Sequence, residues 1–258
     1  MEQSRALLEQ QGVRLAAVSY DSQDTLHAFA EKYGIGFPLL SDRGSAVIRR
    51  FGIFNSNIAP GLRAHGVPHP VEYLVAPDGT VVRKYFVPNY QHRVTGSAVA
   101  LREFGAVGNG VPALTLQSTA VTVVVGLASA TGFAGQEVGF FARFEVEPGW
   151  HVYGSSVAAP YTPTAVTFDD PKVVNQSFQL PPAELVRLAA LDETLPVHSG
   201  SFQGIGSILL KFPLDAGPIT LAGRVRFQPC SETVCEPPEM LPFELTLTLE
   251  PFMVAPHR

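Results

Sequence analysis

The sequence contains no long run of basic residues and no long run of apolar ones. Its 258 residues carry 16% charged side chains and a net charge of −5. No Lys/Arg-rich stretch offers a footprint for nucleic acid, so no nucleic-acid partner is predicted. The longest apolar stretches, such as residues 120–130, are too short to cross a bilayer and are rich in β-branched residues, so no direct membrane span is predicted either.

The N-terminus lacks the apolar segment that a secretory signal peptide requires. Residues 1–14 are polar and follow a helical pattern instead. Taken literally, this start predicts a cytoplasmic protein. A chain that had lost its N-terminus would look the same, so an exported protein is the alternative expectation.

Cysteine is scarce as well, and its position limits the chemistry. The sequence has 2 cysteines, Cys230 and Cys235, and none precedes them. Peroxidase or dithiol chemistry is therefore excluded from residues 1–105, because no thiol is present there. Thiol chemistry in this chain belongs to the stretch "RFQPCSETVCEPPEM", residues 226–240.

What is present suits a chain of two domains. Apolar residues make up 46% of the sequence, enough for packed cores. Glycine and proline interrupt the pattern at residues 102–116, as a linker would. Residues 1–110 have a net charge of +2, and the remainder has a net charge of −7. We expect a first domain at residues 1–106, a linker at 107–114 and a second domain at 115–258.

The first half alternates between helical and strand patterns. The segment "DSQDTLHAFAEKYG" has an Asp/Ser cap, apolar residues at helical spacing and a terminal glycine. The turn "PDGT" joins two strand-like runs into a hairpin. Such alternation predicts an α/β fold. Helices are expected at residues 4–12, 21–34, 43–52 and 95–105, strands at 13–20 and 37–42, and the hairpin at 71–86.

The second half has the pattern of short strands punctuated by Gly, Pro and Asp. Regular strands without helical periodicity predict an antiparallel β-sandwich. One helix-like piece, "PPAELVRLAAL" at residues 181–191, interrupts the pattern. Strands are expected near residues 114–125, 137–147, 164–168, 206–214, 219–227 and 243–250.

Two phrases of the first half resemble the peroxiredoxin-like AhpC/TSA branch of the thioredoxin fold. They are "FAEKYGIGFPLLSDRGSAVIRRFGI" and "GVPHPVEYLVAPDGTVVRKYF". The resemblance covers residues 5–104 and implies a thioredoxin-like α/β domain. It places Pro70 at the family's cis-proline, which lies beside the redox cysteine. The family's active cysteine precedes the matched region, so the resemblance implies an incomplete domain, and truncation of a longer protein is the favoured explanation.

Four readings of Cys230 and Cys235 are open from the residues alone. A zinc site is weakly indicated, since only distant residues such as His151 and His198 could join the pair. Two inert thiols fit poorly in a polar, turn-like stretch. A structural disulfide is plausible, although a bridge closing so small a loop contributes little through chain entropy. The fourth reading is an exchangeable dithiol.

The second half resembles the N-terminal domain of the thiol:disulfide interchange protein DsbD. The phrases "GWHVYGSS", "GSILLKFPL" and "VRFQPCSETVCEPPEMLPFELTL" carry the resemblance, and Q-x-C-x4-C-x-P-P is its most specific part. The resemblance covers residues 115–250. It implies an immunoglobulin-like sandwich in which Cys235 forms the mixed disulfide with a partner and Cys230 resolves it.

The same resemblance implies which residues surround the pair. A cap corresponds to residues 191–204, with His198 inside it and Phe202 as the nearest candidate for a shielding aromatic. His151 and Tyr153 fall where the family has aromatic residues. Glu232 and Glu236 flank the thiols, Glu239 is close in sequence, and neither Lys nor Arg occurs between residues 227 and 257. Carboxylates raise a thiol pKa, so the pair is expected to be an electron donor.

The sequence therefore predicts an incomplete α/β thioredoxin-like domain followed by an all-β immunoglobulin-like sandwich. Its expected function is thiol-disulfide exchange with thioredoxin-like or DsbD-type redox proteins, without an organic or metal cofactor. The family implies the periplasm or another extracytoplasmic bacterial space. The alternatives are an adaptor module with a structural disulfide and a fragment of a redoxin whose active cysteine lies upstream. Oligomeric state is left open.

Overall fold

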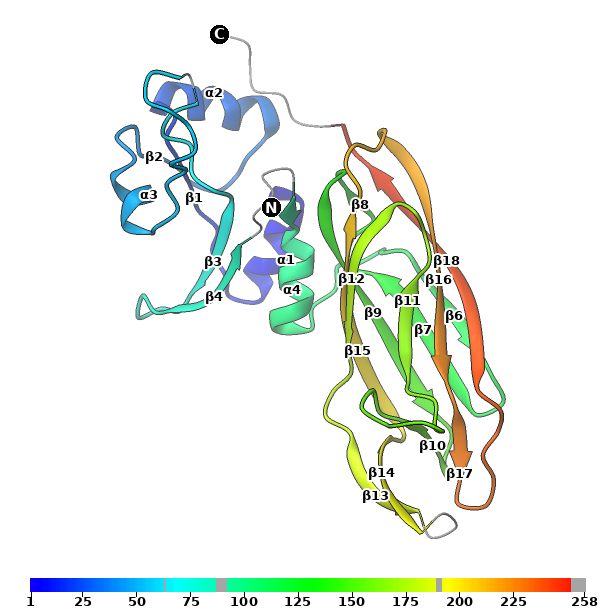
Figure 1. The fold of residues 1–258 in the computed structure, drawn as a ribbon. Coiled ribbons are helices and arrows are strands. Elements are labelled where there is room, and N and C mark those ends of the chain that lie inside the picture. Colours follow the sequence, from blue (N-terminus) through cyan, green and yellow to red (C-terminus); the bar gives the residue numbers. More distant parts are fainter. Residues whose placement is uncertain (63, 87–91, 189–191, 252–258) are drawn as a thin grey trace. The chain divides into compact units, whose positions relative to one another are not determined.

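The computed structural model describes residues 1–62, 64–86, 92–188 and 192–251. Within them the chain forms two compact units, Met1–Gly96 and Ser97–Pro251. The first unit is a mixture of short helices and strands, and the second consists almost wholly of strands (Figure 1). The expected fold classes, an incomplete thioredoxin-like part and an immunoglobulin-like sandwich, are confirmed.

The first unit contains two separate small sheets. β1 (Ala17–Ser19) and β2 (Leu39–Ser41) pair in parallel, and β3 (Val71–Val75) and β4 (Val81–Phe86) form the expected antiparallel hairpin. Among the described residues these two sheets are not joined by strand pairing. The remaining elements of the unit are η1 (Glu2–Ser4), α1 (Arg5–Gln10), α2 (Gln23–Tyr33), α3 (Ala46–Arg50) and β5 (Arg93–Val94).

Helix α2 illustrates how local sequence signals set the boundaries in this unit. The Ser22 hydroxyl accepts a hydrogen bond from the Thr25 amide, which satisfies one of the free amides of the first turn. At the other end Gly34 adopts φ 62° and its amide bonds to the Ala30 carbonyl. That left-handed conformation favours glycine, which is why the helix ends here.

The expectation of a cis-proline at Pro70 is wrong. The cis peptide bonds within the described residues precede Pro160 and Pro213. The His69 amide instead donates to the Ile53 carbonyl at 2.7 Å, in a stretch that runs on directly into β3. A trans bond continues such an extended path, whereas a cis bond shortens the step between Cα atoms and turns the chain.

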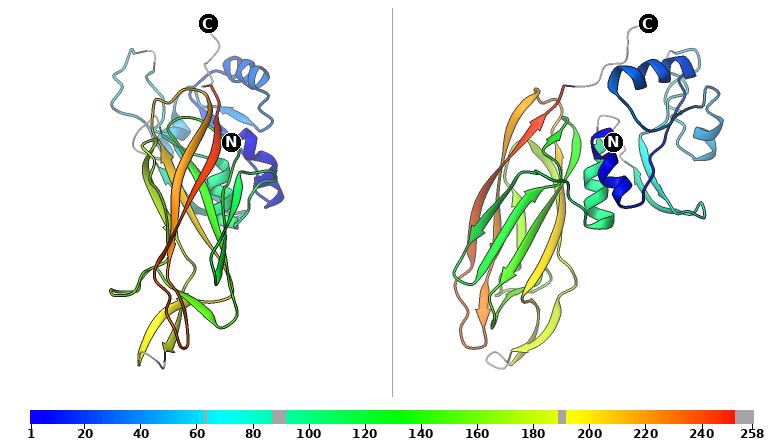
Figure 2. Two further views of the ribbon diagram at one scale, coloured as in Figure 1. Left: turned by 90° about the vertical axis from the view of Figure 1, so that its right-hand side faces the viewer. Right: turned by 180° about the vertical axis from the view of Figure 1, so that it is seen from behind.

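The second unit is a sandwich of two larger sheets. One sheet has the strand order β12–β15–β9–β7–β6 within this unit, and the other has the order β11–β16–β18–β8. The long strands β16 and β18 run side by side along the unit (Figure 2). The bounds are β6 (Ala113–Gln117), β7 (Val121–Leu127), β8 (Thr131–Gly132), β9 (Gln136–Val146), β11 (Ala165–Phe168), β12 (Val173–Gln179), β15 (Ser201–Leu210), β16 (Gly217–Phe227) and β18 (Glu239–Leu249).

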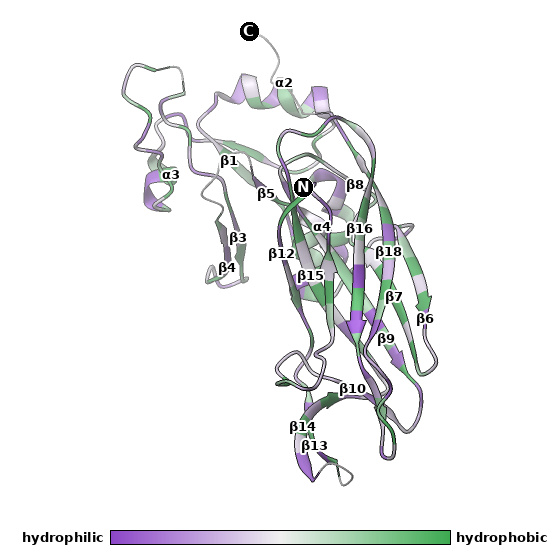
Figure 3. Ribbon diagram, turned by 45° about the vertical axis from the view of Figure 1, so that its right-hand side comes forward, coloured by the Kyte–Doolittle hydropathy of each residue, from purple (hydrophilic) through white to green (hydrophobic). Residues whose placement is uncertain are grey.

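The core of this unit lies between the two sheets. Hydrophobic and hydrophilic residues alternate along strands such as β16 and β18 (Figure 3), because successive side chains point to opposite faces. Phe140 of β9 packs edge-to-face on Phe168 of β11, with ring centroids 5.0 Å apart, and so links the sheets. Helix α4 (Gly96–Phe104) adds Leu101 to a small apolar cluster with Ala128 and Phe141.

A third, smaller sheet lies at one end of the sandwich (Figure 1). Its order is β13–β14–β10–β17, all antiparallel. The bounds are β10 (Trp150–Tyr153), β13 (Glu184–Leu188), β14 (Glu193–His198) and β17 (Pro229–Ser231). The helix-like reading of residues 181–191 is therefore wrong, because Glu184–Leu188 pairs with β14 as a strand, and residues 189–191 lie outside the described residues. Cys230 lies in β17, so this small sheet forms the surroundings of the cysteine pair.

Candidate functional site

Cys230 and Cys235 form a disulfide in the connection between the two longest paired strands. Strand β16 ends at Phe227, and β18 begins at Glu239. Between them the chain forms β17, turns, and returns so that Cys230 and Cys235 face each other in an antiparallel bridge. Their Cα atoms are 4.0 Å apart. The strand-loop-strand placement of the pair follows from the pairing of β16 with β18.

The turn between the cysteines is held by its own hydrogen bonds. The Ser231 amide donates to the Val234 carbonyl at 2.7 Å. The Ser231 hydroxyl accepts from the amides of Thr233 and Val234 at 3.3 and 3.1 Å. On the far side of the bridge the Glu236 amide donates to the Pro229 carbonyl at 2.9 Å. Since these bonds close the loop independently of sulfur, the disulfide is not the loop's only tie.

The two cysteines differ sharply in their exposure to solvent. Cys230 is completely buried and belongs to an apolar cluster with Tyr153, Val157 and Val197. Cys235 is exposed, as is the neighbouring Val234. Attack on a disulfide requires access to one sulfur along the S–S axis. Of the two cysteines, Cys235 is therefore the one open to solvent.

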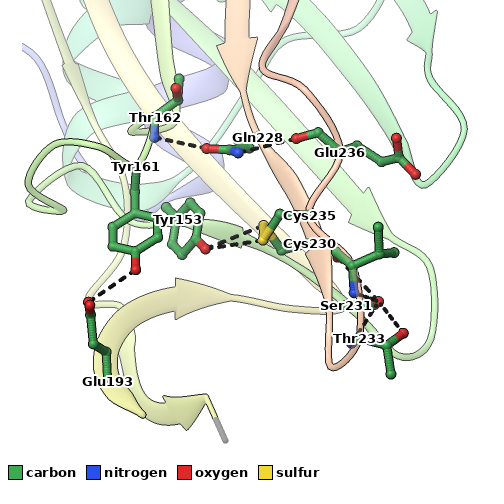
Figure 4. Close-up of a disulfide and its surroundings, with 11 residues drawn as sticks. Tyr153, Tyr161, Thr162, Glu193, Gln228, Cys230, Ser231, Thr233, Cys235 and Glu236 are labelled. Atoms are coloured by element: carbon green, nitrogen blue, oxygen red, sulfur yellow. Dashed lines mark hydrogen bonds between the residues drawn. A yellow bond between two sulfur atoms is a disulfide. The ribbon is translucent and has the colours of Figure 1, made fainter. Parts of the chain in front are cut away.

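Tyr153 lies against both sulfurs (Figure 4). Its hydroxyl oxygen is 3.3 Å from the Cys230 sulfur and 3.5 Å from the Cys235 sulfur. A disulfide sulfur carries no proton, so the hydroxyl is the donor in both contacts. Burial, together with the nearby Tyr161 and Glu193, raises the pKa of Tyr153 above its usual value, which keeps the hydroxyl protonated.

Two further residues, Tyr161 and Glu193, lie around Tyr153, and the sequence analysis singled out neither. The Tyr161 ring packs on that of Tyr153 with centroids 4.9 Å apart, and its hydroxyl donates to Glu193 of β14 at 3.1 Å (Figure 4). Both positions are distant from the cysteines in sequence. Glu193 lies inside the predicted cap at residues 191–204, whereas Tyr161 stands in a segment without a motif, so tertiary structure was needed to place both beside Tyr153.

Gln228 is a third missed residue. Its side-chain oxygen accepts from the Thr162 amide at 3.1 Å, and its side-chain nitrogen donates to the Glu236 carbonyl at 3.2 Å. It therefore ties the cysteine loop to the segment that carries Tyr161. Here a signal was available, because Gln228 is the first residue of the Q-x-C-x4-C motif.

The predicted neighbours His151 and His198 lie on opposite faces of the small sheet. His151 stands directly across from Cys230, and its ring is 5.7 Å from that of Tyr153. His198 stands across from Val152, whose side chain belongs to the main core. Burial lowers the pKa of both histidines, so both are neutral at pH 7.

Phe202 belongs with His198 rather than with the cysteines. Its ring stacks on His198 at 4.5 Å and on Phe144 of the main core at 4.8 Å between centroids. The element that covers the Cys230 cluster is the β13–β14 hairpin, through Val186, Leu188 and Leu195. The predicted cap at residues 191–204 thus overlaps the covering hairpin only in β14, and its first residue, 191, lies outside the described residues.

The carboxylates near the pair in sequence are spread around it in space. Glu232 is exposed at the tip of the turn, and Glu236 is half-buried. The Glu239 carboxylate accepts from the Ser118 hydroxyl at 2.8 Å, at the sandwich edge. The carboxylate connected to Tyr153 through Tyr161 is Glu193, so the acidic character near the pair comes from β14 as well as from the turn.

Two further features bear on the class of site. No group of three or more His, Cys, Asp or Glu side chains arranged for a metal ion occurs in the described ranges. Of the helices in the part of the chain that the structure describes, none is long and apolar enough to cross a membrane.

Family comparisons place the two parts of the chain separately. Residues 1–84 match the AhpC/TSA family, and residues 123–247 match the family "Thiol:disulfide interchange protein DsbD, N-terminal". The second match includes both cysteines, Tyr153, Tyr161 and Gln228. The two resemblances read from the sequence are confirmed.

Individual relatives show the same division. Peroxiredoxin Bcp of Escherichia coli (strain K12) is 32% identical over 74 residues, which are 29% of this chain and 47% of that protein. A putative peroxiredoxin of Shigella flexneri matches equally. The chain spans about half the length of the curated relatives it matches.

Two solved structures resemble the chain at low sequence identity. The N-terminal periplasmic domain of ScsB from Proteus mirabilis is 17% identical, with a TM-score of 0.39, over 53% of this chain and 50% of that one. The N-terminal domain of Neisseria meningitidis DsbD in its reduced form is 16% identical, with a TM-score of 0.31, over 54% of this chain and 85% of that one.

Proposed function

Because residues 123–247 match the N-terminal domain family of DsbD, we propose that the second unit carries out thiol-disulfide exchange with another protein. The observation that carries the proposal is the asymmetry of the disulfide: Cys235 is exposed and Cys230 is fully buried. An exchanging pair needs one sulfur within a partner's reach and a second that remains protected. A purely structural bridge needs neither property.

The reaction proceeds in two balanced exchanges. A partner thiolate attacks the Cys235 sulfur, a new S–S bond joins the two proteins, and the Cys230–Cys235 bond breaks with its electron pair on Cys230. The partner's second thiol then attacks the partner sulfur of the mixed disulfide. Cys235 leaves as thiolate, and the partner keeps the new disulfide. The pair gains two electrons and, from solvent, two protons; the reverse sequence passes them on.

The partner proposed is a thioredoxin-like or DsbD-type redox protein. Such a partner presents its own thiol at an exposed edge, which suits a disulfide at the end of a sandwich. The exposed side chain of Val234 beside Cys235 offers apolar contact next to the reacting sulfur. Acidic residues around the turn, Glu232 and Glu236, favour an electron donor by disfavouring a thiolate.

An extracytoplasmic bacterial location is proposed on the same basis. Disulfides form and persist in oxidising compartments, and the N-terminal domain of ScsB, which resembles this chain, is described as periplasmic. The first unit contains no cysteine, so we propose no peroxide reduction for it. The domain division at residues 1–106, 107–114 and 115–258 is retained as a proposal.

A redox titration of the intact folded chain tests the proposal. The protein is equilibrated in buffers of reduced and oxidised dithiothreitol. Free thiols are then alkylated and counted by mass spectrometry, while circular dichroism confirms that the protein stays folded. We expect full reduction of the pair in the folded state, and faster reduction by a reduced thioredoxin than by dithiothreitol at equal thiolate concentration. A bridge that opens only when the protein unfolds would make it a structural staple and reject exchange.

A further inference from the structure

The hydroxyl of Tyr153 is the one polar group, among the described residues, with hydrogen-bond contacts to both sulfurs. It reaches them from β10, the strand that pairs with β17 and is therefore fixed relative to Cys230. The Tyr153 side chain is completely buried, so its hydroxyl does not exchange these contacts for water. A donor held in this way is in place before any exchange begins.

We propose that Tyr153 is a catalytic residue of the exchange, donating its hydroxyl hydrogen bond to the Cys230 thiolate as the disulfide opens. The inference rests on the proposed function for its biological setting. Its chemistry concerns only the opening of this disulfide by any thiol, and can be measured with a small one.

The need for a donor follows from where the charge is released. When a thiolate bonds to the Cys235 sulfur, the electron pair of the broken bond leaves with Cys230. That sulfur is fully buried among Val157, Val197 and the Tyr153 ring. An anion in apolar surroundings is costly unless a hydrogen bond or a positive charge compensates it. Without compensation, departure of the Cys230 thiolate would limit the rate.

The titratable groups that face Tyr153 do not provide a cation. His151, on the same strand, is neutral because burial lowers its pKa. Tyr161 and Glu193 add a neutral hydroxyl and a negative carboxylate. Neither Lys nor Arg occurs between residues 227 and 257. A neutral hydroxyl donor is therefore the stabilising group that the surroundings offer.

Tyr153 is suited to donate without losing its proton. Its pKa is raised by burial first and by Tyr161 and Glu193 next, so the hydroxyl stays neutral across the pH range in which thiols ionise. A hydrogen bond to an ionised acceptor is about twice as strong as one between neutral groups. The contact thus strengthens as charge develops on Cys230, and it stabilises the transition state more than the closed disulfide.

Tyr161 provides a matched control. Its ring packs on Tyr153, but its hydroxyl bonds to Glu193 rather than to sulfur. Tyr153→Phe and Tyr161→Phe therefore each delete one hydroxyl from the same aromatic pair. Only the first deletion removes a sulfur contact.

The first experiment measures the rate at which dithiothreitol reduces the oxidised full-length protein at fixed pH. We expect Tyr153→Phe to slow reduction about three- to tenfold, and Tyr161→Phe, which leaves both sulfur contacts in place, to slow it clearly less. An unchanged rate for Tyr153→Phe would overturn the proposal. Equal slowing by both variants would also overturn it, because loss of packing would then explain the effect.

The second experiment does not depend on exchange. In a Cys235→Ser background Cys230 is the only thiol, and the 13C shift of its Cβ reports the thiol pKa. We expect Tyr153→Phe to raise that pKa by about one unit, a tenfold change in the ionisation constant, and Tyr161→Phe to change it clearly less. If Tyr153→Phe left the pKa of Cys230 unchanged, the proposed role of Tyr153 would be overturned. Failure of the proposed function would instead appear as a disulfide that resists dithiothreitol in the wild-type protein.

Discussion

His151 lies directly opposite Cys230 in the antiparallel pairing of β10 and β17, and two residues further along β10 Tyr153 touches both sulfurs. Directly opposed residues and residues two apart share one face of a sheet. A single short strand therefore presents both a neutral imidazole and a hydroxyl on the face that carries Cys230, and the hydroxyl contacts the sulfurs. The adjacent hairpin β13–β14 covers the same face.

Trapping with single-cysteine variants should identify the attacked sulfur. A thioredoxin-like partner with one remaining cysteine is first converted to its mixed disulfide with thionitrobenzoate. Cys230→Ala leaves the exposed Cys235, whose thiolate displaces thionitrobenzoate and joins the two proteins. Cys235→Ala leaves only the buried Cys230, and we expect at least tenfold slower adduct formation, measured on non-reducing gels.

The reverse order of adduct rates would show that Cys230 is the reacting sulfur. An unfolded control, in which both variants react alike, separates burial from intrinsic reactivity of the two thiols.

Loss of the disulfide should reduce stability only modestly. The cysteines are five positions apart, and loop-closure entropy for so short a loop corresponds to about 2 kcal/mol at most. The hydrogen bonds of Ser231 and Glu236 hold the same loop without sulfur. We expect the Cys230→Ser, Cys235→Ser double variant to lose about 1–2 kcal/mol in urea unfolding.

Phe140→Ala, in the main core, provides the scale for comparison and should cost about 3–5 kcal/mol. A double cysteine variant that fails to fold would contradict an exchangeable pair and favour a structural bridge.

His151 should make stability depend on pH. Burial lowers its pKa below 6.5 in the folded protein, so the unfolded chain takes up the proton first as pH falls. The free energy of unfolding should decrease from about pH 6.5 downward until the lower, folded-state pKa is reached. His151→Phe should flatten part of this decrease, measured as urea midpoints at several pH values.

His198 shifts in the same direction, so a single variant removes only part of the pH dependence. His198→Phe should flatten another part of the decrease, for the same physical reason. A wild-type profile retained in His151→Phe would refute the contribution of His151.

Gln228 should stabilise the cysteine loop through its two hydrogen bonds. Gln228→Leu leaves the Thr162 amide and the Glu236 carbonyl without that partner, and should cost about 1–3 kcal/mol. Gln179→Leu, at an exposed position of β12, is the matched control and should change stability by less than about 0.5 kcal/mol. Equal effects of the two substitutions would mean that the Gln228 bonds contribute nothing specific.

Local sequence signals predicted much of the architecture. Capping and glycine signals located α2, the "PDGT" turn located the β3–β4 hairpin, and alternation located the long strands β9, β16 and β18. These features depend on interactions between residues close in sequence or on a periodicity that one strand displays by itself. The Cys230–Cys235 pair likewise stands in a local motif of 11 residues, Q-x-C-x4-C-x-P-P, although the residues alone left open whether the pair forms a disulfide.

Residues 184–188 show where local signals fail. A short run containing Leu185 and Leu188 fits a helix and a strand equally well, and pairing with β14 decides in favour of the strand. The bond before Pro70 was likewise assigned by resemblance, whereas the contact between His69 and Ile53 sets the local path of the chain. At residues 184–188 the partner strand, which the local pattern does not reveal, provides the deciding energy.

The sequence alone determined that thiol chemistry is confined to Cys230 and Cys235, because no other residue of the chain carries a thiol. Tertiary structure alone decided which cysteine is exposed, that Phe202 packs on His198 and Phe144 rather than at the pair, and that Tyr161, Glu193 and Gln228 surround it. The physical reason is strand register. A shift of one residue in the pairing of β10 with β17 would turn His151 and Tyr153 to the opposite face, and no local pattern fixes that register.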